Sequence, residues 1–151
     1  MLTKHQKNLA AIIHLSTFSQ FFIPLGNFIL PLILWTMNKD KSEFIDDHGK
    51  QAINFQLSLL LYAIALIIIS LPIFLLVFAG SFPEEFIYNN HDIYFDGNDF
   101  RNVSGLIIFG VLAGIIALSI FIMEVVLVIM AMVKANNGEK YKYPLTINFI
   151  K

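Results

Sequence analysis

Two long apolar stretches decide the fold. The first runs from Ala52 to Ala79, AINFQLSLLLYAIALIIISLPIFLLVFA, and contains no charged residue. The second runs from Val103 to Val133, VSGLIIFGVLAGIIALSIFIMEVVLVIMAMV, and its one charged residue is Glu124. Each is longer than the roughly 20 residues that cross a hydrocarbon core about 30 Å thick. We therefore expect two long transmembrane helices, over about 43–79 and about 103–135.

The composition agrees with a membrane protein. Hydrophobic residues make up 57% of the chain and charged residues 14%, whereas soluble domains have about 45–50% and about 25%. A soluble chain of 151 residues could not bury that much apolar surface. The net charge is −1 and there is no basic stripe, so we expect the lipid bilayer as a partner and no nucleic acid.

The apolar region between Leu9 and Met37 is interrupted by Pro24, Gly26 and Asn27, residue types typical of a turn. Two interpretations remain open. The region is either one kinked span or a hairpin of two short helices that enters and leaves the membrane by the same face. Irregular backbone at membrane depth is tolerated where other helices bury it.

The lysines favour the hairpin, which we place at about 5–37. With a hairpin, the N-terminus, the 38–50 segment and the chain from 134 onward share one side of the membrane. These segments hold every lysine, and the opposite loop, 80–102, holds Arg101. Because lysine and arginine gather on the cytoplasmic side, we expect a multi-pass protein of the cell membrane with both termini in the cytoplasm and the loop outside.

Two segments outside the spans have their own patterns. Loop 80–102 is acidic and rich in aromatic residues, which favour the headgroup zone of a membrane. In the tail, 136–151, Leu145, Ile147 and Phe149 alternate with polar residues, a strand-like period. Such a tail lies along the interface, docks on the bundle or pairs with another chain. We expect the whole chain, 1–151, to form a single membrane domain.

The first long helix carries a polar stripe. At 100° per residue, five polar residues fall on one face: Asp47, Gln51, Asn54, Ser58 and Tyr62. One interpretation is a groove that guides a polar or peptide substrate part-way into the bilayer. The other is hydrogen bonding between helices, which polar residues commonly provide in membranes.

Glu124 shares a face of the second long helix with Gly110, Gly114 and Ala117. The two glycines have the small-x-x-x-small spacing that lets helix backbones approach closely in lipid, so we expect Glu124 to face a packed helix. An acid at mid-membrane costs about 3 kcal/mol on insertion scales, which the apolar residues of this span offset. Glu124 is either a proton or substrate site or a structural carboxylic acid.

No motif for catalysis or cofactor binding is present in the sequence. Cysteine is absent, the four histidines lack metal-ligand spacing, and there is no phosphate-binding glycine loop. Asp92, Asp96 and Asp99 do not follow the order of a calcium loop. We expect no enzyme activity, no catalytic residue, no cofactor and no metal site.

Two motifs resemble a known family. The first runs from Phe22 to Trp35 and continues into FIDDHGKQAINFQ, Phe44–Gln56, which contains Asp47, His48, Gly49, Lys50 and Gln51. The second is KANNGE, Lys134–Glu139, followed by YPLT, Tyr143–Thr146. Together they resemble small bacterial membrane proteins catalogued as a domain of unknown function and grouped with the twenty-kilodalton subunit of the Tic translocon of the chloroplast inner envelope.

The resemblance implies a four-helix-type bundle with both termini on one side and, by analogy, a translocon-like role. The fold that we expect is an all-α integral membrane protein, a small helical bundle with two long transmembrane helices and an N-terminal broken or re-entrant helical hairpin. Three functions are open. The leading one is a bundle that contacts, inserts or helps to translocate other polypeptides, alone or as a homo-oligomer. The second is a small transporter or proton-coupled element using Glu124, and the third is a structural or lipid-organising protein.

Overall fold

The computed structural model describes the backbone of residues 2–80 and 97–151. Every regular element in these ranges is helical, in the order α1 (Lys4–Leu15), η1 (Ser16–Phe21), α2 (Gly26–Thr36), η2 (Lys39–Lys41), α3 (Glu43–Gly80) and α5 (Gly97–Asn137). The protein is an all-α integral membrane protein with two long helices and an N-terminal hairpin, as the apolar pattern predicted.

The described chain forms two compact units. The first combines Met1–Tyr62 with Ile122–Lys151, and the second is Ala63–Phe121. The first unit contains the hairpin, the beginning of α3, the end of α5, the C-terminal tail and every lysine of the sequence. It therefore holds all the candidate sites on α3, and Glu124 on α5.

In the second unit, α3 and α5 expose many large apolar side chains. Leu76 is 77% exposed and Ile68 66% exposed on α3, and Ile108 is 60% exposed on α5. A helix that is apolar all round is stable when protein or lipid surrounds it. Both helices are long and apolar enough to cross a membrane, so the bilayer accounts for this surface.

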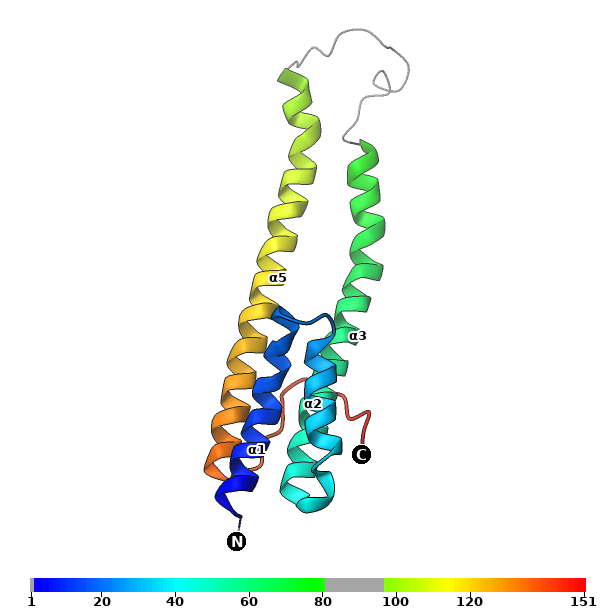
Figure 1. Ribbon diagram of the computed structural model, residues 1–151. Coiled ribbons are helices and arrows are strands. Elements are labelled where there is room, and N and C mark those ends of the chain that lie inside the picture. Colours follow the sequence, from blue (N-terminus) through cyan, green and yellow to red (C-terminus); the bar gives the residue numbers. More distant parts are fainter. Residues whose placement is uncertain (1, 81–96) are drawn as a thin grey trace. The chain divides into compact units, whose positions relative to one another are not determined.

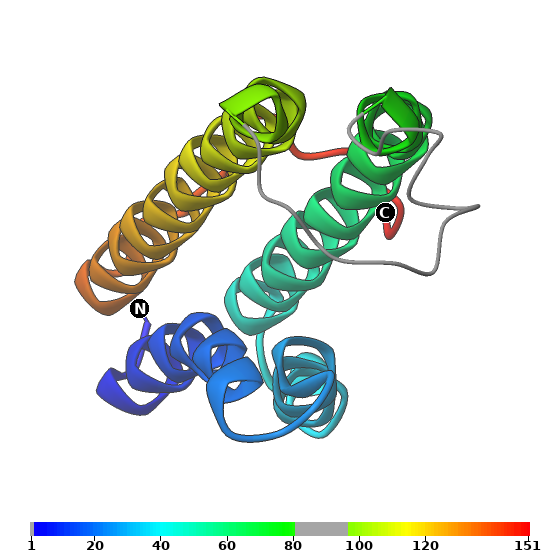
Figure 2. The same cartoon turned by 90° about the horizontal axis from the view of Figure 1, so that it is seen from above.

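The N-terminal region consists of two short helices rather than one kinked span. Figure 1 shows α1 and α2 side by side and running in opposite directions, and Figure 2 gives the same arrangement from above. With 12 and 11 residues, each helix is about 17 Å long at 1.5 Å per residue. Neither helix spans a core of about 30 Å. The region is therefore a broken helical hairpin rather than one span, and Phe22 at its tip is 87% exposed.

The turn of the hairpin differs in detail from the prediction. Pro24 lies in it, whereas Gly26 and Asn27 are the first residues of α2, and the left-handed residue is Leu25, with φ 58°. Gly26 lies where a Cβ atom would come within 2.6 Å of the Ser19 carbonyl oxygen. Gly26 thus permits the close approach of η1 to α2, while Leu25 adopts the left-handed conformation of the turn.

Small residues and one tryptophan pack the hairpin against the two long helices. Ala10 and Ala11 of α1 lie in one apolar cluster with Phe44 of α3 and Ala135 of α5. A second cluster joins both hairpin helices to α3 through Ile13, Trp35, Ile45, Ala52 and Ile53. Gly49 belongs to the same contact, because its missing side chain leaves room for the Trp35 ring. The core of the first unit is therefore built between hairpin and long helices.

The second long helix extends beyond its expected bounds of about 103–135. α5 begins at Gly97 and ends at Asn137, so residues 97–102 are helical rather than loop. Glycine, asparagine and aspartate, which occupy positions 97–99, favour the first positions of a helix. Gly138, with φ 84°, follows the last residue and begins the C-terminal tail, 138–151. The rest of the acidic segment predicted as an outer loop, residues 81–96, lies outside the described residues.

Candidate functional site

The polar stripe of α3 binds the C-terminal tail of the same chain. Each of its five members contacts the tail: Asp47, Gln51, Asn54, Ser58 and Tyr62. Tyr62 donates its hydroxyl to the Leu145 carbonyl at 2.6 Å. Ser58 Oγ accepts the N–H of Ile147 at 2.9 Å. This is the face of α3 that one interpretation of the sequence assigned to a substrate groove. In the structure the C-terminal tail covers it.

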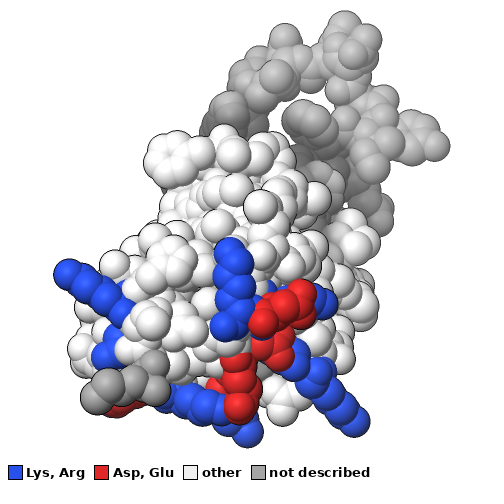
Figure 3. Space-filling view, turned by 60° about the horizontal axis from the view of Figure 1, so that its bottom comes forward, with Lys and Arg blue, Asp and Glu red and all other residues white. Residues whose placement is uncertain are grey.

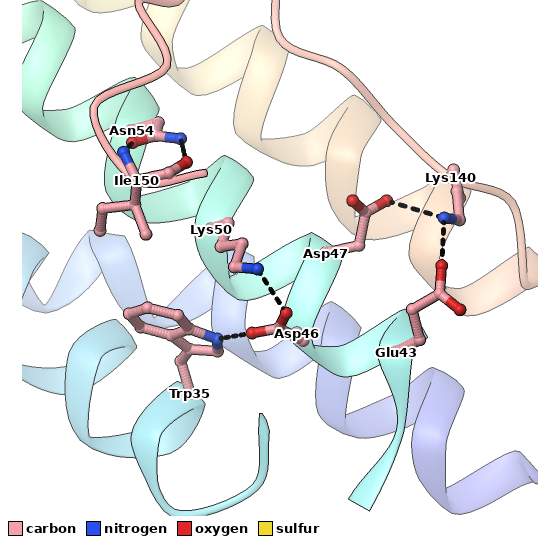
Figure 4. A network of polar contacts seen from close by, with 8 residues as sticks. All are labelled: Trp35, Glu43, Asp46, Asp47, Lys50, Asn54, Lys140 and Ile150. Atoms are coloured by element: carbon pink, nitrogen blue, oxygen red, sulfur yellow. Dashed lines mark hydrogen bonds and ion pairs between the residues drawn. The ribbon is translucent and has the colours of Figure 1, made fainter. Parts of the chain in front are cut away.

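Asn54 makes the largest set of these bonds, and Figure 4 shows those with Ile150. Its Oδ1 accepts the N–H of Phe149 at 3.1 Å and the N–H of Ile150 at 2.9 Å. Its Nδ2 donates to the Ile150 carbonyl at 2.9 Å. Ser58 also donates to the Asn54 carbonyl at 2.7 Å, which joins the two side chains into one patch. Both residues are almost completely buried.

The tail reverses direction along α3. It runs from Lys140, near Asp47 at the start of α3, to Leu145 at Tyr62, and then returns to Ile150 at Asn54. Leu145 has φ 59° at the reversal. The strand-like tail predicted from alternation is wrong, since no residue of the tail forms a strand. Its backbone groups bond to side chains of α3, which requires no neighbouring strand.

A buried cluster of two histidines and one tyrosine lies beside the stripe. Tyr143 Oη is 2.9 Å from His14 Nδ1, and His14 Nε2 is 2.8 Å from His48 Nδ1. Tyr143 also stacks on Phe55, with 4.1 Å between ring centroids. The cluster joins α1, α3 and the tail at the centre of the first unit.

Burial sets the protonation states in this cluster. Desolvation lowers the pKa of His14 to about 3, with the charge of His48 as the second cause, so His14 is neutral at pH 7. Desolvation raises the pKa of Tyr143, so its hydroxyl keeps its proton. Tyr143 then donates to Nδ1 of His14, which leaves the proton of His14 on Nε2, directed at His48. Sequence reasoning missed this cluster, because its three members are far apart in the chain.

Glu124 accepts hydrogen bonds from the hairpin and from α3. Gln20 Nε2 lies 3.0 Å and Gln56 Nε2 3.3 Å from Glu124 Oε1, and Asn27 Nδ2 donates to Gln56 Oε1 at 2.9 Å. The carboxyl group thus faces packed helices, and these are the hairpin and α3 of the first unit.

The small residues expected on the same packed face lie in the second unit and are open. A Cβ atom at Gly110 or Gly114 would meet no described atom within 4 Å, and Ala117 is exposed. The described residues place no helix against these glycines, so close packing at Gly110 and Gly114 stays a prediction. Helical periodicity places them on the face of Glu124, but only the part of α5 from Ile122 onward, which includes Glu124, belongs to the first unit.

Charged side chains gather at one end of the first unit, as Figure 3 shows. Lys50 pairs with Asp46 at 2.6 Å, and Asp46 also accepts the indole N–H of Trp35 at 2.9 Å. Lys140 of the tail lies 3.2 Å from Glu43 and 3.5 Å from Asp47 (Figure 4). The motif from Asp47 to Gln51 thus contributes to four features. Asp47 and Gln51 bind the tail, His48 belongs to the histidine cluster, Gly49 contacts Trp35, and Lys50 and Asp47 form ion pairs.

The sequence matches the magnetosome magnetite crystal formation protein family, MamF/MmsF, over residues 5–150. The chain belongs to this family. The match includes the hairpin, both long helices and the tail as far as Ile150, so the tail-binding face lies within it. No curated protein and no solved structure matched the chain.

The family match corrects the resemblance drawn from the sequence motifs. The two motifs were assigned to proteins grouped with the Tic translocon subunit, whereas the chain is a member of the MamF/MmsF family. The translocon-like role was implied by that resemblance, and the MamF/MmsF match does not support it. The broader expectation, a polytopic membrane protein, agrees with the family and with the two long apolar helices.

Proposed function

We propose that this protein is a structural, lipid-organising membrane protein that contributes to magnetite crystal formation in a magnetosome-type membrane. The match to the MamF/MmsF family over residues 5–150 supports the role in crystal formation. The protein carries out this role without catalysis. Its two apolar helices lie in the lipid, and the bundle of the first unit is held together by its own C-terminal tail.

One observation carries the structural part of the proposal: all five polar residues of the α3 stripe bond to the tail of the same chain. A groove that guides substrates needs free donors and acceptors along its length. Here the backbone of the tail uses them. The stripe therefore supports a bundle that is closed on itself.

The same reasoning disfavours a transporter that uses Glu124. Its carboxyl oxygen accepts from Gln20 and Gln56, and these amides come from two different elements. A structural carboxyl group that links η1, α3 and α5 explains the geometry. In addition, the described residues contain no group of three histidine, aspartate or glutamate side chains placed to hold a metal ion.

The distribution of charge supports one orientation. Every lysine belongs to the first unit, and lysine gathers on the cytoplasmic side of membranes. We assign the charged end of this unit to the cytoplasm. The acidic segment of the sequence, with Glu84, Glu85, Asp92, Asp96 and Asp99, then belongs to the opposite side.

Reconstitution tests the proposal. Ferrous and ferric iron are co-precipitated with vesicles that contain the protein, with protein-free vesicles and with vesicles that carry an unrelated two-span protein. We expect the protein to shift the size distribution of magnetite crystals seen by electron microscopy. Distributions equal to both controls would contradict the role in crystal formation.

A second measurement separates the structural function from transport. Vesicles loaded with an iron-quenched dye or a pH-sensitive dye should show no flux above protein-free vesicles. A flux that the Glu124→Gln variant abolishes would instead establish the transporter and overturn the structural proposal.

A further inference from the structure

The first unit has a charged pocket at the end of the hairpin, beside its tryptophan. The pocket has a volume of about 390 Å³. Its lining comes from the end of α2, η2, the beginning of α3 and the end of the tail: Trp35, Lys39, Asp40, Asp46, Lys50, Ile150 and Lys151. We propose that this pocket binds the phosphate of an anionic phospholipid headgroup. This inference does not depend on the role in crystal formation.

The charges of the pocket leave an excess of ammonium groups. Three lysines and two aspartates line it. Asp46 is already neutralised, because it pairs with Lys50 at 2.6 Å and accepts the Trp35 N–H at 2.9 Å. Lys39 and Lys151 form no ion pair with any described carboxylate. The side chains of the lining thus carry one net positive charge, and two lysine side chains are available to an anion.

The indole ring gives the pocket an apolar wall. Trp35 is buried, and Lys39 Nζ lies 5.8 Å from the centroid of its ring. Ile150 adds a second apolar side chain, which Asn54 fixes through the backbone bonds described above. Tryptophan and lysine together are typical of the interface between lipid and water, where a headgroup lies.

The surroundings of the pocket favour a lipid over a free anion. α2 ends at the pocket and exposes Ile29, Leu32 and Ile33 along its length. A phospholipid bound by its phosphate therefore has apolar helix surface available for its acyl chains, which inorganic phosphate cannot use. Basic pockets between helices on the cytoplasmic side are a general form of anionic headgroup site.

A change at Asp40 predicts the direction in which the affinity for an anionic headgroup should move. Asp40 lines the pocket and forms no ion pair with a described lysine. Because it repels a phosphate, Asp40→Asn should strengthen the binding of an anionic headgroup. If the natural ligand were zwitterionic, with its ammonium group on Asp40, the same change would weaken binding.

The single tryptophan of the chain is a reporter of the site. The full-length protein is placed in nanodiscs of phosphatidylcholine and phosphatidylglycerol, in which either one or the other lipid carries brominated acyl chains. Bromine quenches the fluorescence of a nearby indole. The ratio of quenching by brominated phosphatidylglycerol to quenching by brominated phosphatidylcholine then measures the local preference for the anionic lipid.

We expect a ratio well above unity for the natural protein, a fall toward unity for K39Q/K151Q, and a rise for Asp40→Asn. The matched control is K4Q/K142Q, which removes two exposed lysines of the same unit away from the pocket and should leave the ratio unchanged. Each lysine that contacts the phosphate in the pocket should contribute a roughly fivefold change in the ratio, whereas the control lysines lie outside the pocket lining.

Three results would overturn the proposal. The first is a natural protein quenched equally by the two lipids. The second is an equal fall in K39Q/K151Q and K4Q/K142Q, which would show a general effect of surface charge. The third is a change in Trp35 emission when inorganic phosphate alone is added to nanodiscs without phosphatidylglycerol, which would assign the pocket to a free anion.

Discussion

Asn54 of α3 and Ile150 of the tail form a reciprocal pair of hydrogen bonds. The Asn54 amide donates to the Ile150 carbonyl at 2.9 Å and accepts the Ile150 N–H at 2.9 Å. A side-chain amide offers one acceptor and donors in a plane, as a peptide group does. It therefore satisfies the tail backbone without a strand, and it explains why an extended tail is stable on a helix.

Replacing Asn54 with Leu should release the end of the tail. The change removes three hydrogen bonds and leaves the Ile150 N–H to water, whereas the Phe149 N–H keeps the Ile147 carbonyl at 3.1 Å as an acceptor. We expect faster amide hydrogen exchange at Ile150, a smaller increase at Phe149, and little change at Ile147, which Ser58 holds. The control is Asn148→Ala, a change at an exposed residue of the tail. Unchanged exchange in Asn54→Leu would contradict the docked tail.

Two substitutions at Glu124 should show whether its hydrogen-bond acceptor or its charge stabilises the protein. Glu124→Leu leaves the amides of Gln20 and Gln56 without their acceptor, and an unsatisfied buried polar group costs about 1–3 kcal/mol. Glu124→Gln keeps a carbonyl oxygen at the position and should cost less. Unfolding midpoints in detergent measure both. Equal losses for the two variants would show that the charge, and not the acceptor, is what the site requires.

Gly49→Ala should destabilise the protein, although alanine favours helices. In an exposed helix the change from glycine to alanine stabilises by about 1 kcal/mol. At Gly49 the new methyl group would overlap the ring of Trp35, and overpacking of this kind costs about 1–3 kcal/mol. We expect a lower unfolding midpoint and a shift in tryptophan emission. Gly110→Ala is the control, because open space surrounds that position among the described residues, and it should be neutral or stabilising.

The first unit should become less stable as the pH is lowered, because His14 is buried in its neutral form. Its pKa is about 3 in the folded protein against 6.5 for the free side chain, so the unfolded chain binds a proton more readily than the folded one. The contribution of His14 is complete above pH 6.5 and is lost progressively as the pH falls toward 3. At pH 5 the loss is about 2 kcal/mol. The dependence should weaken in His14→Gln but not vanish, because burial also lowers the pKa of His48. Unfolding midpoints of the two proteins at pH 7.5 and pH 5 measure the difference.

The sequence by itself determined the membrane class and the number of long helices. The runs 52–79 and 103–133 are too long and too apolar for a soluble core, and length alone fixes that conclusion. The lysine distribution and the turn residues near Pro24 also favoured the hairpin, which the structure contains. Periodicity further placed Asp47, Gln51, Asn54, Ser58 and Tyr62 on one face of α3.

Only the tertiary structure decided what that face binds. Its partner is the chain end about 90 residues further on, and no local pattern connects the two segments. The same holds for Glu124, whose partners Gln20 and Gln56 come from other elements, and for the open face at Gly110 and Gly114. The physical reason is that helical spacing sets which side chains share a face. Hydrogen bonds and packing then depend on segments that reach that face only when the chain has folded.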